Sequence, residues 1–234
     1  GARRVDKLQQ VKESIVAHAD TAEYANSPGA IIYTQCDVTD QDSVTHLIKT
    51  AESEFNCADS GIDVLINCAG VMYFTEMKNC LVDQWTQTLD VNCKGVLHGI
   101  GAVLPSMTQH KKGKIITISS DAGLRQFQTL AVYCASKAFV ETLTEITRRE
   151  LVGTGVTLTT ICPGDVKGTE LIMKNTDTSA AGKIGVEIGK PVGEGFKREQ
   201  LLDCADVANA VIYALTAPPH VAINTVLIEP RDQE

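Results

Sequence analysis

Short apolar runs alternate with longer amphipathic stretches along the whole chain. Ile115–Ile118 is β-branched and continuously apolar, which predicts a strand buried on both faces of a sheet. In the longer stretches, apolar residues recur every three or four positions, which predicts helices. The alternation favours an α/β fold with a doubly wound parallel sheet. A length of 234 residues suits a single domain that spans residues 1–234.

The same patterns give the expected boundaries. Strands are expected over Ala30–Cys36, Val64–Ile66, Ile115–Ile118, Val156–Cys162 and Thr225–Ile228. Helices are expected over Arg3–Ala25, around Val44, Leu47 and Ile48, over Leu81–Gln109 with an interruption near Lys94, from Tyr133 to Leu151, and over Ala205–Leu215. Thr39 or Asp40 is placed to cap the second helix. Residues 167–200 show no clear periodicity, and a loop of that length is usually functional or disordered.

Composition narrows the possible functions. The chain has 21 basic and 29 acidic residues and a net charge of −8, which argues against a nucleic-acid partner. No apolar run approaches the roughly 20 residues of a membrane span, and no signal peptide opens the chain. The eight cysteines are scattered without a metal-binding spacing. We interpret them, Cys134 included, as reduced and buried thiols of a cytoplasmic protein without a metal site.

Candidate chemistry follows the central apolar run. That run ends in Ser119-Ser120, and Tyr133 and Lys137 lie four residues apart at the start of the next helix. Such spacing places the phenol and the ammonium on one helix face, where the cation is expected to lower the phenol pKa. A phenol tuned in this way can act as an acid or base on a carbonyl or alcohol, and Ser120 can bond the same oxygen. The alternative is an ordinary solvated helix face.

Further motifs occur in a fixed order around these residues. They are Asn67-Cys68-Ala69-Gly70 after an apolar run, Asp90-Val91-Asn92-Cys93-Lys94-Gly95, and Pro163-Gly164 after Val156–Cys162. Together with Ser120, Tyr133 and Lys137 they resemble the short-chain dehydrogenase/reductase family over nearly the whole chain. The resemblance implies a Rossmann-type sheet and an oxidoreductase that moves a hydride between a nicotinamide cofactor and a secondary alcohol or ketone.

The resemblance also implies roles for single residues. Tyr133 would be the acid/base, Lys137 its partner and a ribose contact, Ser120 the donor to the substrate oxygen, and Asn92 the residue that holds a water of the proton relay. Further cofactor contacts would be Asp37 and Val38 at the adenine, Asn67, Ala69 and Gly70 at the ribose, and Pro163, Gly164, Val166 and Thr169 at the nicotinamide. Cys68 replaces a commoner asparagine, and Thr169 stands one residue later than the usual threonine.

Two arginines near the start of the chain bear on the choice of cofactor. A basic residue after the second strand of such a sheet accommodates the 2′-phosphate of NADP. This role falls best on Arg3, with Arg4 second, so we expect NADP; the alternative is a pair of ordinary surface arginines. The family's first strand, glycine-rich turn and most of its second strand have no counterpart here, so an N-terminally truncated chain is expected.

Substrate and partners are less sharply indicated. Residues 167–200 correspond to the family's substrate lid, the alternative being a mobile surface loop. The ending from Ala217 to Pro230 resembles the branch of NADP-dependent 3-hydroxy-acid (serine-type) dehydrogenases and dehydrogenase/reductase family member 11. Arg125 could meet a substrate carboxylate, or Met72, Tyr73 and Phe74 could line a pocket for a ketone or steroid. We expect a homodimer or homotetramer. The alternative function is an inactive fragment or a non-catalytic member that acts through protein contacts.

Overall fold

The chain folds around a parallel β-sheet. The computed structural model describes residues 1–19, 29–194 and 200–233. Its sheet has four strands in the order β1-β2-β3-β4, and all neighbouring pairs are parallel. The strands are β1 (Val64–Asn67), β2 (Gly113–Ile118), β3 (Val156–Pro163) and β4 (Thr225–Ile228). The predicted α/β class and parallel sheet are therefore confirmed, with these strands within two residues of their expected boundaries.

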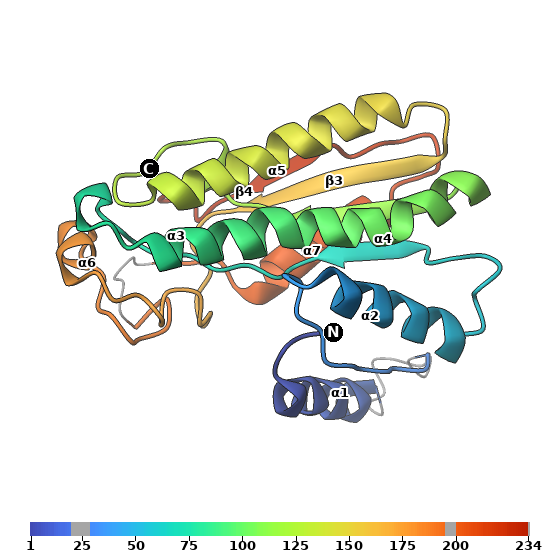
Figure 1. The fold of residues 1–234 in the computed structure, drawn as a ribbon, viewed down its shortest axis with the longest axis horizontal. Helices are drawn as coiled ribbons and strands as arrows, with labels where there is room; N and C mark the ends of the chain where they lie inside the picture. The colour runs from blue at the N-terminus through green and yellow to red at the C-terminus, as the bar shows by residue number, and fades with distance from the viewer. Residues whose placement is uncertain (20–28, 195–199, 234) are drawn as a thin grey trace.

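Helices connect the strands and cover both faces of the sheet (Figure 1). They are α1 (Val5–Ala19), α2 (Gln41–Glu54), α3 (Val82–Leu89), α4 (Gly95–His110), α5 (Ala131–Glu150), α6 (Thr178–Ile184) and α7 (Cys204–Leu215). Short helical turns lie at η1 (Met77–Asn79), η2 (Asp90–Lys94) and η3 (Asp121–Gly123). Asp40 caps α2 by accepting a hydrogen bond from the backbone N–H of Asp42 at 3.1 Å, as the sequence predicted.

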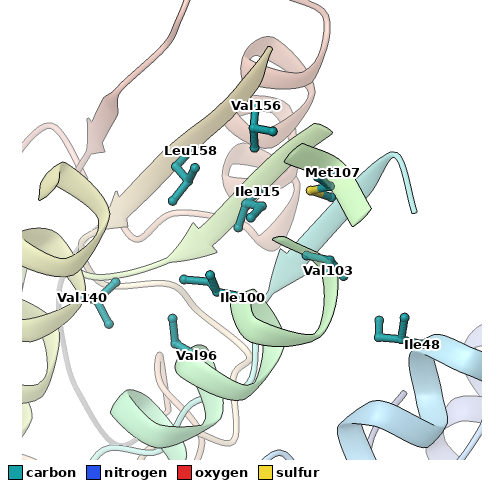
Figure 2. Packing of buried hydrophobic residues seen from close by; sticks show 9 residues of the cluster. All are labelled: Ile48, Val96, Ile100, Val103, Met107, Ile115, Val140, Val156 and Leu158. Carbon is teal, nitrogen blue, oxygen red and sulfur yellow. The ribbon is translucent and has the colours of Figure 1, made fainter. Parts of the chain in front are cut away.

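The central strands β2 and β3 are buried on both faces. On one face, Ile115 and Leu158 pack against Val103 of α4 and Val140 of α5 (Figure 2). On the other face, Ile116 and Ile161 pack against α7. Strands covered in this way need apolar residues at every position rather than at alternate ones. Ile115, Ile116, Leu158 and Ile161 meet this requirement, while Thr117, Thr159 and Thr160 are buried polar residues of the same strands.

The long helical stretch after β1 is interrupted where the sequence predicted. α3 and α4 are joined by the π-helical turn η2, which contains Asn92 and ends at Lys94. A π-turn widens the helix by one residue and often marks a functional position. Gly95 follows this turn, and a Cβ there would lie 2.8 Å from a methyl carbon of Val38. The close approach therefore requires glycine.

The expected strand Ala30–Cys36 is wrong. Within the described residues, only Gln35 of this run pairs, in an isolated parallel bridge with Ala2. The backbone N–H of Cys36 donates to the carbonyl of Ala2 at 3.0 Å. A strand exists only through the hydrogen bonds of a neighbour. An apolar β-branched pattern without a paired neighbour therefore remains irregular.

α1 is shorter than expected and poorly covered. It ends at Ala19, and residues 20–25 of the expected helix lie outside the described residues. Of the apolar residues that predicted the helix, Leu8 is half-buried, whereas the other four are exposed: Val5, Val11, Ile15 and Val16. Figure 1 shows α1 lying away from the sheet, beyond α2. Its periodicity therefore predicted the helix correctly but not its burial.

Residues 167–200 contain more regular structure than their sequence predicted. Their described part includes the helix α6 and a small core in which Ile172, Ala180 and Val192 pack with Phe74. Asp177 caps α6 by accepting a hydrogen bond from the backbone N–H of Ala180 at 3.0 Å. α6 has too few turns for its pattern to stand out from glycine-rich surroundings.

The cysteines are free, but they are not uniformly buried. Cys36, Cys134 and Cys162 are buried, whereas Cys68, Cys80 and Cys204 are exposed. The expectation of buried thiols is thus wrong for these three, while Cys134 packs in a cluster with Ala122 and Tyr133 as expected. Among the described residues, no group of His, Cys, Asp and Glu could hold a metal ion, and no helix is both long and apolar enough to cross a membrane.

Candidate active site

The predicted catalytic residues meet beyond the carboxyl ends of the strands. The backbone N–H of Ser119 donates to the carbonyl of Ile161 at 2.7 Å, which extends the pairing of β2 with β3. Ser120 then begins the turn η3, while Tyr133 and Lys137 lie near the start of α5. This edge of an open parallel sheet is where ligands bind in doubly wound folds.

Tyr133 and Lys137 are both buried and lie on one face of α5. The Nζ atom of Lys137 is 5.7 Å from the centre of the Tyr133 ring and donates to the carbonyl of Ile118 at 3.0 Å. Burial raises the pKa of the Tyr133 phenol well above its ordinary value, although a hydrogen bond with Ser120 opposes the rise. Burial also lowers the pKa of the Lys137 ammonium to about 8.

The expected lowering of the phenol pKa is therefore wrong for the chain as it stands in this structure. The sequence argument considered only the helical spacing of the two side chains. It omitted the loss of hydration that both charged forms suffer when they are buried. Burial is the largest of the effects on the phenol pKa.

Asn92 lies in the turn η2 and is held by three hydrogen bonds. Its Oδ1 atom accepts from the backbone N–H of Val71 at 2.9 Å, and its Nδ2 atom donates to the Val71 carbonyl at 2.9 Å. The same Nδ2 atom donates to Ser136 Oγ at 3.1 Å. These bonds tie the loop after β1 to α5. Asn92 thus joins the elements that carry the expected ribose contacts and Tyr133.

Two residues that the sequence reasoning missed complete this cluster. Ser120 Oγ donates to Asp121 Oδ1 at 2.8 Å, and Gln233 Nε2 donates to Asp121 Oδ2 at 2.6 Å. The adjacency of Asp121 to Ser120 was the only sequence signal for the carboxylate. Gln233 gave no signal, because the chain's end is brought to this place by tertiary folding alone.

One of the expected ribose contacts, Gly70, lies beside the ammonium of Lys137. A Cβ on Gly70 would lie 3.6 Å from Asn92 Oδ1 and 3.9 Å from Lys137 Nζ, so this backbone faces both side chains. Ala69 and Gly70 are exposed. Asn67 Nδ2 donates to Thr117 Oγ1 of the neighbouring strand at 3.3 Å. The structure therefore brings these residues together at the expected edge.

The expected nicotinamide contacts follow β3. Gly164 donates its backbone N–H to the carbonyl of Ile228 at 2.8 Å, and Pro163 is buried. Val166 forms an isolated bridge with Leu202. Thr169 Oγ1 donates to the carbonyl of Val166 at 3.3 Å. The hydroxyl proton of Thr169 is thus already used within its own segment.

The expected adenine contacts lie at the start of α2. Two hydrogen bonds from Thr39, at 3.0 and 2.9 Å, hold the pKa of Asp37 below its ordinary value, and the Arg3 guanidinium adds to this effect. The Val38 carbonyl contacts His98 Nδ1 at 2.8 Å. Arg4 instead forms an ion pair with Glu170 at 2.7 Å. Arg3 and Arg4 therefore have different surroundings.

Arg125, Tyr73 and Phe74, which were considered for substrate contacts, already form contacts within the protein. Arg125 forms a two-pronged ion pair with Glu229, at 3.0 and 3.2 Å. Tyr73 donates its hydroxyl to Gln87 at 2.6 Å, and Phe74 is buried in the cluster with Ile172. A substrate carboxylate would have to compete with Glu229 for Arg125, so that arginine is a poor candidate for binding it.

Comparisons with known proteins agree with this arrangement. The family model described as short chain dehydrogenase matches residues 2–180. The chain therefore belongs to the short-chain dehydrogenase/reductase family. It is 42% identical over 233 residues to the glycine betaine reductase ATRR of Emericella nidulans, covering 100% of this chain but 16% of that protein. It is 36% identical to the uncharacterized oxidoreductase SSP1627 of Staphylococcus saprophyticus, of which it spans 85%.

Solved structures give the same result. A closed form of serine dehydrogenase complexed with NADP+ is similar with a TM-score of 0.80 and 30% identity, over 100% of this chain and 84% of that one. Serine dehydrogenase from Escherichia coli is similar with a TM-score of 0.75 and 28% identity, over 100% of this chain and 86% of that one. The parallel sheet and its crossing helices are thus those of a dehydrogenase fold.

Proposed function

We propose that this chain is the reductase domain of an NADP-dependent oxidoreductase that interconverts a secondary alcohol and a ketone. The observation that carries the proposal is the convergence of Asn92, Ser120, Tyr133 and Lys137 at the carboxyl edge of the sheet. All four side chains are buried, although each is polar. Polar groups that are withdrawn from water in one place commonly mark a reactive site.

Each residue of this cluster has a separate chemical role. Tyr133 holds the proton that an alcohol oxygen loses or a carbonyl oxygen gains. Ser120, hydrogen-bonded to Tyr133, orients that oxygen. Lys137 places a cation behind the phenol, and Asn92 fixes the distance between the loop after β1 and α5. A bound nicotinamide would supply or accept the hydride.

The residues present fit the ribose and phosphate groups of NADP. A lysine ammonium has three N–H donors, and within the described residues Lys137 has one hydrogen bond, to Ile118. Ribose hydroxyls above Gly70 would accept from the others, since the Gly70 backbone faces that ammonium. Arg3, close enough to Asp37 to lower its pKa, would meet the 2′-phosphate that distinguishes NADP from NAD. The serine dehydrogenase with the similar fold was solved with NADP+.

We favour a small hydroxy acid over a steroid as the substrate. Two of the similar proteins carry the names serine dehydrogenase and glycine betaine reductase, and both named compounds are small and polar. Tyr73 and Phe74 are buried in packing rather than exposed as an apolar pocket. The lid role of residues 167–200, the homodimer or homotetramer and the cytoplasmic location remain predictions.

The decisive experiment replaces the phenol. In the full-length natural protein, Tyr133→Phe should lower kcat by at least about 10²-fold, since general acid–base catalysis contributes typically 10²–10⁴-fold. The Kd for NADPH should change little, because only one hydroxyl is removed. Tyr213→Phe, on the exposed face of α7, is the matched control and should keep full activity. Near-normal kcat in Tyr133→Phe would reject the acid–base role of Tyr133, whereas no turnover in the unaltered protein would favour a non-catalytic member of the family.

A further inference from the structure

The chain's C-terminal segment folds back onto the active site. After β4, the Ile228 carbonyl accepts from the backbone N–H of Gly164 at 2.8 Å. Glu229 is held by Arg125, and Gln233 N donates to the carbonyl of Pro230 at 3.0 Å. These contacts place the Gln233 side chain beside the loop that carries Ser120. The segment is therefore fixed at both of its ends.

Gln233 bridges two parts of the site with its side-chain amide. Its Nε2 atom donates to Asp121 Oδ2 at 2.6 Å, and its Oε1 atom accepts from the backbone N–H of Asp165 at 3.0 Å. A Cβ on Gly164 would lie 2.3 Å from Gln233 Oε1, so only glycine allows this approach. The amide uses a donor on one side and an acceptor on the other, which fixes its orientation.

Asp121 in turn holds the Ser120 side chain in place. Asp121 is buried, and its Oδ1 atom accepts from Ser120 Oγ and from the backbone N–H of Ala122, both at 2.8 Å. The Ser120 oxygen also accepts from the Ala122 N–H at 3.2 Å and lies within hydrogen-bonding reach of the Tyr133 phenol.

We propose that Asp121 and Gln233 are positioning residues of the active site, which hold the Ser120 side chain where its oxygen lies beside Tyr133. Gln233 acts through Asp121, and neither residue needs to touch the substrate. The inference rests on the proposed function, because it assumes that Ser120 and Tyr133 act on one substrate oxygen. It adds a contribution from the C-terminal segment to that site.

The test exchanges donor and acceptor between the two residues in the full-length natural protein. Gln233→Glu places a carboxylate against the Asp121 carboxylate, and Asp121→Asn places an amide donor against the Gln233 donor. Each single change should lower kcat by about ten- to a hundredfold, the value of one charge-assisted hydrogen bond. The double variant restores a donor opposite an acceptor and should recover kcat to within about threefold of the unaltered protein.

A second readout separates positioning from folding. The titratable and charged groups that face the Tyr133 phenol are Asp121, Cys134 and Asp165, with Lys137 against its ring. Removing the Asp121 charge should therefore move the midpoint of the alkaline rise of alcohol oxidation to lower pH in Asp121→Asn. The KM for NADPH should stay within about twofold in every variant. Asp232→Asn, an exposed neighbour of Gln233 paired with Arg231, is the matched control.

The possible failures can be told apart. A double variant no more active than the product of the single effects, or a Gln233→Glu variant with normal kcat, would overturn the positioning role. Either result together with an inactive Tyr133→Phe would leave the proposed function intact. An active Tyr133→Phe would instead reject the acid–base role of Tyr133, and no turnover in the unaltered protein would reject the proposed function itself. Thermal unfolding of each variant shows whether a lost activity reflects a lost fold.

Discussion

Arg3 and Arg4 are neighbours in sequence with different surroundings. The ion pair of Arg4 with Glu170 is solvent-exposed, and exposed pairs contribute little to stability. Arg3 lies instead near Asp37, one of the expected adenine contacts. Arg3 therefore stays the first candidate for meeting a 2′-phosphate, and this role remains a prediction.

This difference predicts the effect of removing each arginine. Arg3→Gln should raise the KM for NADPH about ten- to a hundredfold and the KM for NADH much less, because a charge-assisted hydrogen bond contributes about 1.5–3 kcal/mol. Arg4→Gln is the control and should have the smaller effect. Steady-state kinetics with both cofactors provide the measurement. Equal effects of Arg3→Gln on NADPH and NADH would remove Arg3 from cofactor selection.

At the scale of elements, α6 is tied to the loop that precedes α3. Asp177 Oδ2 accepts from the backbone N–H of Glu76 and from Asn79 Nδ2, both at 2.9 Å. Glu76 also pairs with Lys183 of α6, and hydrogen bonds from Lys183 and Ser179 lower the pKa of Glu76 to about 2. The Glu76 carboxylate therefore remains charged through the physiological range, so these contacts persist. They hold the expected lid against the loop after β1.

The anchoring can be weakened without removing the helix cap. Asp177→Asn keeps Oδ1 as the acceptor for the Ala180 N–H but turns an amide toward the donors of Glu76 and Asn79. We expect a several-fold higher KM for the substrate and faster hydrogen exchange in Thr178–Ile184, with an unchanged KM for NADPH.

The control for this change lies in the same segment. Glu187→Gln removes an exposed ion pair with Lys190 that does not reach the loop, and it should alter none of the three quantities. If Asp177→Asn left both the substrate KM and the exchange of α6 unchanged, residues 167–200 would not act as a lid that depends on this anchor.

At the scale of the whole molecule, the sheet is unevenly covered. β1 forms one edge of the described sheet, and Val64 and Ile66 are 39% and 45% exposed. Beside them, a cavity of about 140 Å³ lies between the start of the chain, α2, α4 and β1. Apolar residues of α1 are exposed as well. Exposed edges and apolar faces favour association with other chains.

These exposures predict the behaviour of residues 1–234 expressed by themselves. The polypeptide should unfold without a sharp cooperative transition, and NADPH should not raise its midpoint. Total stabilities are only about 5–15 kcal/mol, so an incompletely covered sheet has little reserve. Thermal unfolding with and without NADPH gives the measurement. A cooperative transition that NADPH shifts upward would contradict the prediction.

Local patterns alone determined most of the elements. Runs rich in β-branched residues predicted β2 and β3, because such residues suit strands that are covered on both faces. Apolar residues at helical spacing predicted α4, α5 and α7, because a helix that packs on a sheet buries one apolar face. Spacing also predicted that Tyr133 and Lys137 share a face, since residues four apart on a helix are neighbours. The motifs around them were sufficient to indicate the family.

Only the tertiary structure decided the features that depend on distant partners. Residues 30–36 have a strand pattern, but a strand needs a paired neighbour, and the structure pairs only Gln35 in this run. The phenol pKa of Tyr133 depends on burial, which its spacing from Lys137 does not reveal. Gln233 reaches Asp121 across 112 positions of sequence. No local pattern records such a contact, because it exists only once the sheet has brought the chain's end to its carboxyl edge.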